Sequence, residues 1–157
     1  MANAPVALGG PPQWATDQHN ILLHTLHWNQ DEARINHFNT QISLAKMSRW
    51  TAARTFNASC HHDSEPLQAL DLLPVLIPMP VVPAPPAPGA ALALPALFVA
   101  PPIILPAPPP NFPATKGALR NLQSNALAVL LAAYGQAVPV THMLRRTAFA
   151  SFVGVRL

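Results

Sequence analysis

The chain has 157 residues and a formal net charge of +3, and its length is that of one ordinary domain. Sixteen of its twenty prolines nevertheless lie between Pro66 and Pro113, and no charged residue occurs from Leu72 to Thr115. This distribution predicts folded parts on either side of a connector, each too small to enclose a large buried active site. The single cysteine, Cys60, excludes an internal disulfide and is typical of a reducing, intracellular environment.

The N-terminal part is predicted to be disordered over residues 1–12 and helical over residues 13–65. The first stretch has two glycines and two adjacent prolines, and it lacks the basic start and apolar core of a secretory signal. Residues 13–65 contain neither glycine nor proline, and apolar residues recur there at three- and four-residue spacing. The predicted stripe consists of Ile35, Phe38, Ile42, Ala45, Ala52 and Phe56, after a first apolar run of Ile21, Leu22, Leu23 and Leu26.

Two arrangements of residues 13–65 remain open from the sequence. Thr16 or Asp17 would start one long amphipathic helix, or Asn29 would start a second helix and make a helical hairpin. In either case the stripe needs a partner, because an isolated amphipathic helix leaves its apolar face in water. We expect that partner to be the first helix folding back, a second copy of the chain, or another helical protein.

Residues 66–112 form an apolar, proline-rich connector that is predicted to be a disordered linker. Proline removes a backbone donor and disfavours helix in the residue before it, so short polyproline II pieces are expected. Proline-free stretches such as GAALAL and ALFVA fall far short of the ~20 residues of a membrane span, and no membrane association is expected. Matches to the PxxP pattern arise automatically with this many prolines, which favours a spacer over an SH3 ligand.

Histidine and cysteine residues are the candidates for metal binding or catalysis. His24 and His27 lie three residues apart, and Cys60-His61-His62-Asp63 is a dense cluster of donor groups. The chain has no CxxC or HExxH pattern, and adjacent histidines do not easily face one ion. No third group is available to activate Cys60 as a nucleophile. We therefore expect no metal, no cofactor and no enzymatic activity.

Residues 113–157 are predicted to form a small module of two to three helices. The expected helix starts and ends are Thr115, Ser124 or Asn125, Gly135, Thr141 and Gly154. The expected facing stripes are Leu127, Leu130, Leu131 and Tyr134 on one helix, and Met143, Leu144, Ala148 and Phe152 on the last.

The order of this module resembles the SAP motif, a family that folds as helix, extended loop and helix and binds DNA or chromatin. The resemblance lies in Leu119 and Leu122, the segment ALAVLLAAYG, a proline-containing link and HMLRRTAFASFVGV, over about residues 113–155. It implies that Tyr134-Gly135 closes the first helix, and that Leu144 and Phe152 are core positions of the second. It also places Arg145 and Arg146 on the exposed side that approaches DNA.

The chain departs from the SAP pattern at two places. Gln136 stands where the family usually has leucine, and Val140-Thr141-His142 replaces an opening of the type Gly-Thr-Lys. The second change removes an expected phosphate contact. In overall style the chain is similar to proteins that are numerous in mushroom-forming fungi, a similarity that implies no particular activity.

Charge also points to nucleic acid at the C-terminal end. Residues 116–157 carry five basic and no acidic side chains, whereas residues 1–71 carry four basic and six acidic ones. The candidate DNA-binding residues are Lys116, Arg120, Thr141, Arg145 and Arg146. Such contacts, together with free N–H groups at a helix start, hold phosphates without reading sequence. We therefore expect a weak, sequence-nonspecific contact with duplex DNA, and a nuclear location if it is formed.

Two other interpretations stay open. In the first, the chain is a scaffold whose connector and N-terminal helix bind proteins, and its C-terminal arginines serve only to solvate a helical hairpin. Alternatively it has no selected function, for which a biased proline- and alanine-rich connector would be unremarkable.

Overall fold

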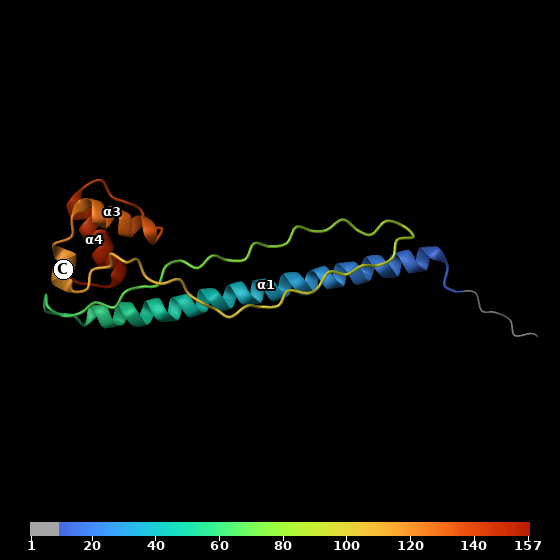
Figure 1. Cartoon of the computed structure of the whole chain (residues 1–157), viewed down its shortest axis with the longest axis horizontal. Coiled ribbons are helices and arrows are strands. Elements are labelled where there is room, and N and C mark those ends of the chain that lie inside the picture. Colours follow the sequence, from blue (N-terminus) through green and yellow to red (C-terminus); the bar gives the residue numbers. More distant parts are fainter. Residues whose placement is uncertain (1–9) are drawn as a thin grey trace, which may run out of the picture. The chain divides into compact units, whose positions relative to one another are not determined.

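The computed structural model describes residues 10–157, and it confirms the mostly helical fold class: about half of these residues are helical and none of them forms a strand. The helices are α1 (Gln13–Ala58), α2 (Lys116–Arg120), α3 (Ser124–Ala133) and α4 (His142–Val153) (Figure 1). Most of the stretch expected to be disordered, residues 1–12, lies outside the described residues. Residues 10–12 are non-helical and exposed. No helix in the described range is long and apolar enough to cross a membrane.

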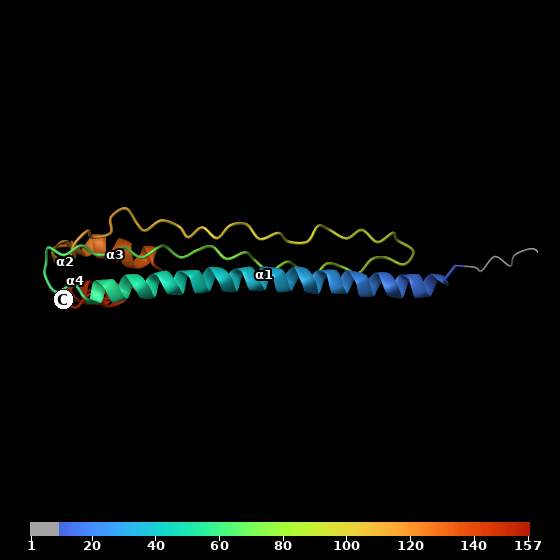
Figure 2. The same ribbon diagram turned by 90° about the horizontal axis from the view of Figure 1, so that it is seen from below.

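Helix α1 is one uninterrupted helix of 46 residues, seen as such in both views (Figures 1 and 2). The helical hairpin does not form, because nothing in this stretch interrupts the backbone hydrogen bonds near Asn29. The helix ends at Ala58, earlier than the expected limit of residue 65. The chain then turns, with the N–H of His62 donating to Glu65 Oε2 at 2.8 Å just before Pro66.

The chain divides into two compact units that do not follow its sequence order. The first unit is made of residues up to Phe38 and of Ile77–Pro101, and the second of Asn39–Leu76 and Pro102–Leu157. This division differs from the expected four consecutive parts, because the connector contributes to both units. Its segments pack against different stretches of α1 instead of serving only as a spacer.

In the first unit, a connector segment without regular secondary structure lies against α1. The ring of Phe98 packs on Phe38 with their centroids 5.7 Å apart, and the N–H of Phe98 donates to Asp31. Arg34 donates to the Phe98 carbonyl at 3.4 Å. The connector reverses direction at residues 87–90, where the N–H of Gly89 donates to Asp17 Oδ1 at 2.9 Å. These contacts bury the middle of the predicted stripe, including Phe38.

In the second unit, α3 and α4 pack together around a core of large apolar side chains. The predicted face of α3 is confirmed, since its four residues are each at most 1% exposed; they are Leu127, Leu130, Leu131 and Tyr134. The rings of Tyr134, Phe149 and Phe152 stack at centroid distances of 5.1–6.4 Å. Figure 1 shows the two short helices side by side.

The predicted face of α4 is wrong in its first turn. Met143 and Leu144 are 70% and 57% exposed, whereas Phe149 and Val153 are completely buried. The face of α4 that packs into the core is therefore the one that carries Phe149, a larger side chain in the later turns of the helix. The SAP resemblance implied that Leu144 is a core residue, whereas the structure leaves it exposed.

The core of the second unit reaches beyond residues 113–157. Leu70 of the connector is 1% exposed and lies in the same cluster as α3 and α4. The hydroxyl of Tyr134 donates to the Leu70 carbonyl at 2.7 Å. Asn57 of α1, also fully buried, donates to the carbonyls of Gln68 at 3.0 Å and Val153 at 2.9 Å. Helices of ten and twelve residues bury too little apolar surface alone, so these added segments complete the core.

Most of the predicted helix ends are confirmed. The hydroxyls of Thr115 and Thr141 accept from the N–H groups of Ala118 at 3.1 Å and Leu144 at 3.3 Å, as capping residues do. Gly135 and Gly154 have φ values of +66° and +85°, in the left-handed region expected after a helix. Helix α3 begins at Ser124, one of its two expected starts, but it has no side-chain cap: Gln123 precedes it without a capping hydrogen bond, and the hydroxyl of Ser124 binds Arg145.

Candidate nucleic-acid interface

Lys116 does not reach the surface as a DNA-binding residue would. It is 6% exposed, and its Nζ donates to the backbone carbonyls of Cys60 and His61 at 3.3 Å each. The N–H of Gly117, next in the chain, donates to the carbonyl of Asp63 at 2.8 Å. The first turn of α2 is therefore bound to the loop after α1, and the ammonium group of Lys116 lies within this contact instead of facing solvent.

Arg145 is also engaged within the protein. Its Nε donates to the Pro139 carbonyl at 2.6 Å, and its Nη1 donates to the Ser124 hydroxyl at 2.9 Å and to the Ser124 carbonyl at 3.3 Å. The guanidinium thus joins the start of α3, the extended link and α4. The SAP resemblance implied an exposed Arg145 that faces DNA, whereas the observed side chain is half-buried and holds the link in place.

Arg120, which is exposed, and Arg146, which is half-buried, lie together at the edge of the second unit. The Nη1 of Arg146 donates to the Arg120 carbonyl at 3.3 Å. The Nη1 of Arg120 forms an ion pair with Asp63 at 2.8 Å, and the side chains of Arg120 and Asp63 are exposed, at 43% and 53%. An exposed pair of this kind contributes ~0–1 kcal/mol, so Arg120 can exchange the carboxylate for another anion at little cost.

Thr141 is exposed at the start of α4, as a phosphate contact requires. Its hydroxyl already accepts from the N–H of Leu144, so one of the free donors of the helix start is taken. The neighbouring His142 has its Nε2 2.9 Å from the Leu122 carbonyl. The helix start thus keeps part of the anion-binding capacity expected of it.

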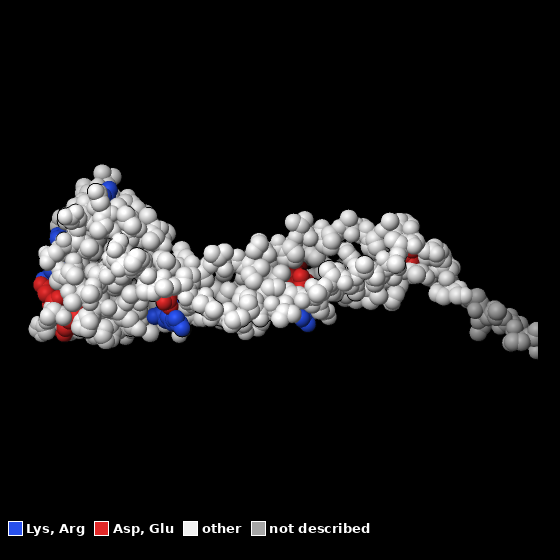
Figure 3. All heavy atoms as spheres, in the orientation of Figure 1, with Lys and Arg blue, Asp and Glu red and all other residues white. Residues whose placement is uncertain are grey.

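The charged side chains of the second unit do not merge into one basic surface on the face that Figure 3 shows. Blue atoms there are separated from one another, and several of them border red atoms. Two arginines of this unit form ion pairs, Arg49 with Asp71 at 3.2 Å and Arg120 with Asp63 at 2.8 Å. Of the five candidate residues, the structure brings Arg120 and Arg146 together and turns Lys116 and Arg145 inward.

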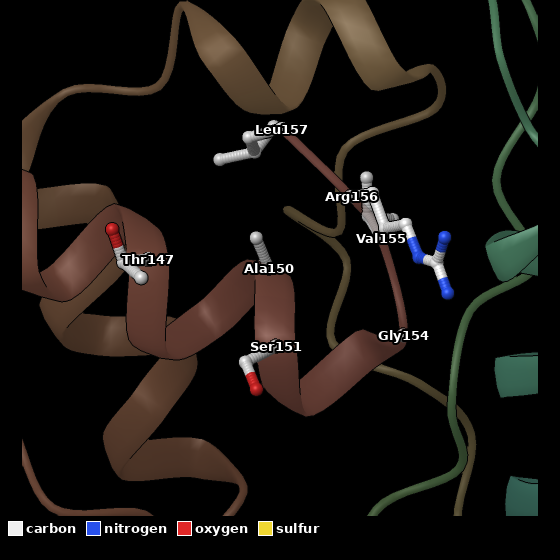
Figure 4. A pocket seen from close by; sticks show the side chains of 7 residues that line it. All are labelled: Thr147, Ala150, Ser151, Gly154, Val155, Arg156 and Leu157. Atoms are coloured by element: carbon white, nitrogen blue, oxygen red, sulfur yellow. The ribbon is translucent and has the colours of Figure 1, made fainter.

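An open pocket of about 400 Å³ lies between α4 and the residues that follow it. Its lining consists of Thr147, Ala150, Ser151, Gly154, Val155, Arg156 and Leu157 (Figure 4). The side chain of Arg156 points away from the hydroxyls of Thr147 and Ser151. These polar groups do not converge on one point, and the lining contains no pair of nucleophile and base.

A smaller pocket of about 180 Å³ lies in the first unit, between α1 and the connector. It is lined by His24, His27, Trp28, Asp31, Pro80, Val81, Pro83 and Pro95. The Nε2 of His27 and the Nε1 of Trp28 are buried without a hydrogen-bond partner. Because neither atom is accessible to solvent, they do not open onto the pocket as ligand-binding groups would.

The two candidate groups of metal-binding residues do not assemble. Within residues 10–157, no three histidine, cysteine or acidic side chains come close enough to hold an ion. Cys60 is buried with its Sγ 3.5 Å from the Pro66 carbonyl, as a thiol donating to the backbone. The N–H of His62 donates to Glu65 and lowers the pKa of that carboxyl group. These residues shape the loop between α1 and the connector.

The comparisons with known proteins identify no relative. No protein-family model, curated protein or solved structure matches the chain.

Two pairs of exposed apolar side chains on α1, one pair in each unit, were not expected from the sequence. Leu22, Leu26, Leu44 and Met47 of α1 are each more than half exposed. The signal was available, because their spacing fits a helix as well as that of the stripe that was followed. Only the structure shows which of the two faces the connector covers.

Proposed function

We propose that the protein is a non-enzymatic binding protein whose C-terminal helices, SAP-like in their order, contact duplex DNA weakly and without sequence preference. The observation that carries this proposal is the position of Arg120 and Arg146, whose groups meet at the surface of the second unit. Thr141 at the start of α4 is the third candidate contact. A role of this kind implies a nuclear location.

The charge of the second unit supports such a contact. The unit has eight basic and three acidic side chains, while the first unit has one basic and three acidic ones. A positive field of this kind attracts a polyanion, and phosphate contacts supply most of nonspecific DNA affinity. With Lys116 and Arg145 bound internally, we expect only about two phosphates to be neutralised, and binding is correspondingly weak.

The test is a fluorescence titration of the full-length chain against a labelled duplex of mixed sequence at low salt. The full chain is needed because the core includes residues of α1 and the connector. The double variant Arg120→Gln, Arg146→Gln should lose most of its affinity, since it removes both proposed phosphate contacts. Two duplexes of unrelated sequence should bind the unchanged protein equally well.

Arg156→Gln, combined with Arg49→Gln, is the matched control for this experiment. It removes the same total charge from the same unit at two exposed arginines elsewhere. Unchanged affinity in the control, with a large loss in the test variant, supports the proposed site. Equal losses would mean that only the net charge matters, and an absence of binding by the unchanged protein would refute DNA binding.

A further inference from the structure

The smaller pocket, between α1 and the connector, lies wholly inside the first unit. Its volume is about 180 Å³, close to the roughly 150 Å³ of an apolar cavity that holds a benzene-sized ligand. Helix α1 contributes side chains from two successive turns, and the connector contributes Val81 and three prolines. Because each proline ring fixes its own backbone φ, this wall needs little ordering when a ligand enters.

The surface of this pocket is mostly apolar, and Trp28 is its largest side chain. Trp28 also lines a second pocket of about 240 Å³, together with His24 and Pro83. Since the Nε1 of Trp28 is covered, its side chain presents only carbon atoms to either pocket. Among aromatic side chains, the indole ring attracts a cation most strongly. A ligand in contact with Trp28 therefore gains affinity from a positive charge.

Within the described chain, no cation lies over the ring of Trp28, in contrast to that of Trp50 in the second unit. The Nζ of Lys46 lies 4.6 Å from the centroid of the Trp50 ring, and the guanidinium carbon of Arg54 lies 5.5 Å from it. The ring of Trp50 is thus in contact with cations of the chain itself, whereas that of Trp28 is available to a ligand.

Asp31 supplies a negative charge to the lining of the pocket. It is half-buried, and one of its carboxylate oxygens accepts from the N–H of Phe98. Neither of the two ion pairs found in residues 10–157 includes it. Arg34, the one base of the first unit, donates to the Phe98 carbonyl instead. A half-buried carboxylate without a counter-ion from the described chain favours a cation beside it.

We propose that this pocket binds a small organic cation, an ammonium group with a compact apolar body, in contact with the Trp28 ring and the Asp31 carboxylate. The two residues are three positions apart on α1, so their side chains are neighbours and reach the same ligand. A metal ion would need several oxygen ligands, whereas most of this lining is carbon. The site is independent of DNA binding, because every candidate phosphate contact belongs to the second unit.

The first test is calorimetric titration of the full-length chain with choline, and with the neutral alcohol in which carbon replaces the choline nitrogen. The two ligands have the same shape, and ionic strength is kept equal. We expect the alcohol to bind about tenfold more weakly, since it lacks the charge that Trp28 and Asp31 attract. Equal affinity for both would overturn the proposed class of ligand, and a lack of choline binding would overturn the site.

Asp31→Asn tests the carboxylate, because the amide keeps an oxygen that can accept from Phe98 and removes only the charge. Asp17→Asn is the matched control. Asp17 belongs to the same unit and accepts from the N–H of Gly89, but it does not line the pocket. Asp31→Asn should weaken choline binding about tenfold, and Asp17→Asn about twofold or less. Equal losses would mean that the net charge of the unit alone attracts choline, and would contradict the proposed site.

A second measurement locates the bound cation through the tryptophan side chains. In nuclear magnetic resonance spectra, choline should shift the indole N–H signal of Trp28 and leave that of Trp50 unchanged, since Trp50 already contacts Lys46 and Arg54. The spectrum of Trp28→Phe assigns the Trp28 signal. A shift confined to Trp50, or to the exposed Trp14, would place the cation elsewhere and refute binding in this pocket.

Discussion

Asn57 joins three segments of the second unit through its polar contacts: α1, the connector and the end of α4. Its side chain is fully buried, donates to the carbonyls of Gln68 and Val153, and accepts from the N–H of Gln68 at 2.7 Å. Asn57→Ala should lower the free energy of unfolding by about 2–4 kcal/mol, because buried backbone groups lose their partner. Urea denaturation measures the change. Asn125→Ala, at an exposed position of α3, should change it by less than about 0.5 kcal/mol, and equal effects would contradict this role.

Tyr134 makes the stability of the fold sensitive to alkaline pH. Burial raises the pKa of its phenol above the ordinary value of 10, with a smaller contribution from the charge of Asp71. The folded chain then keeps the proton that the unfolded chain loses, so the stability that Tyr134 contributes is complete below pH ~10 and falls as pH rises above it.

This dependence can be followed directly, because Tyr134 is the single tyrosine of the chain. Its ultraviolet titration should have a midpoint above 10 and should coincide with loss of near-ultraviolet circular dichroism. Tyr134→Phe should cost about 1–2 kcal/mol at neutral pH through the lost bond to Leu70, and should make stability above pH ~10 less dependent on pH. A reversible titration at pH ~10 without unfolding would show that the phenol is not buried.

At the same scale, the sequence indicated which residues are basic but not which of them stay at the surface. Lys116 bonds to carbonyls 55 and 56 positions away in the chain, and Arg145 bonds to Ser124 and Pro139. Contacts between distant segments leave no local pattern. The capping roles of Thr115 and Thr141 could be predicted because a helix cap depends on neighbouring residues alone.

At the scale of elements, the connector contributes to the core of the second unit through residues around Leu70. This segment has no regular secondary structure, yet Leu70 is 1% exposed among the residues of α3 and α4. Leu70→Ala should cost about 2–4 kcal/mol, since it leaves a cavity, whereas Val75→Ala, at a position 89% exposed, should be nearly neutral. Thermal unfolding compares the two variants, and a neutral Leu70→Ala would show that the connector is not packed there.

Apolar periodicity alone predicts only part of the buried face of α1. It predicted the buried residues Ile35, Phe38 and Ile42 correctly, but not the C-terminal end of that stripe. There Ala53 and Asn57 are buried in place of Ala52 and Phe56. A spacing of three or four residues sets the kind of element, while the partner that covers it selects the face. The partner at this end is the C-terminal module, whose contact with α1 the sequence did not reveal.

At the scale of the whole molecule, each unit joins segments that are distant in sequence, and both need the connector. Its proline content predicted correctly that it forms neither helix nor strand. The same composition suggested a linker between separate modules, because apolar residues among prolines show no periodic pattern that would indicate packing. The segments that make up each folded unit could therefore not be predicted from the order of the composition shifts.

The most direct test of the proposed function is the salt dependence of DNA binding by the full-length chain. Contact through Arg120 and Arg146 predicts that the logarithm of the binding constant falls against the logarithm of salt concentration with a slope of about −2, from two phosphates at ~0.9 each. A slope of about −4 or steeper would require further basic side chains to contact phosphates, and would contradict a site formed by Arg120 and Arg146 alone. No binding at low salt would contradict a DNA-binding function.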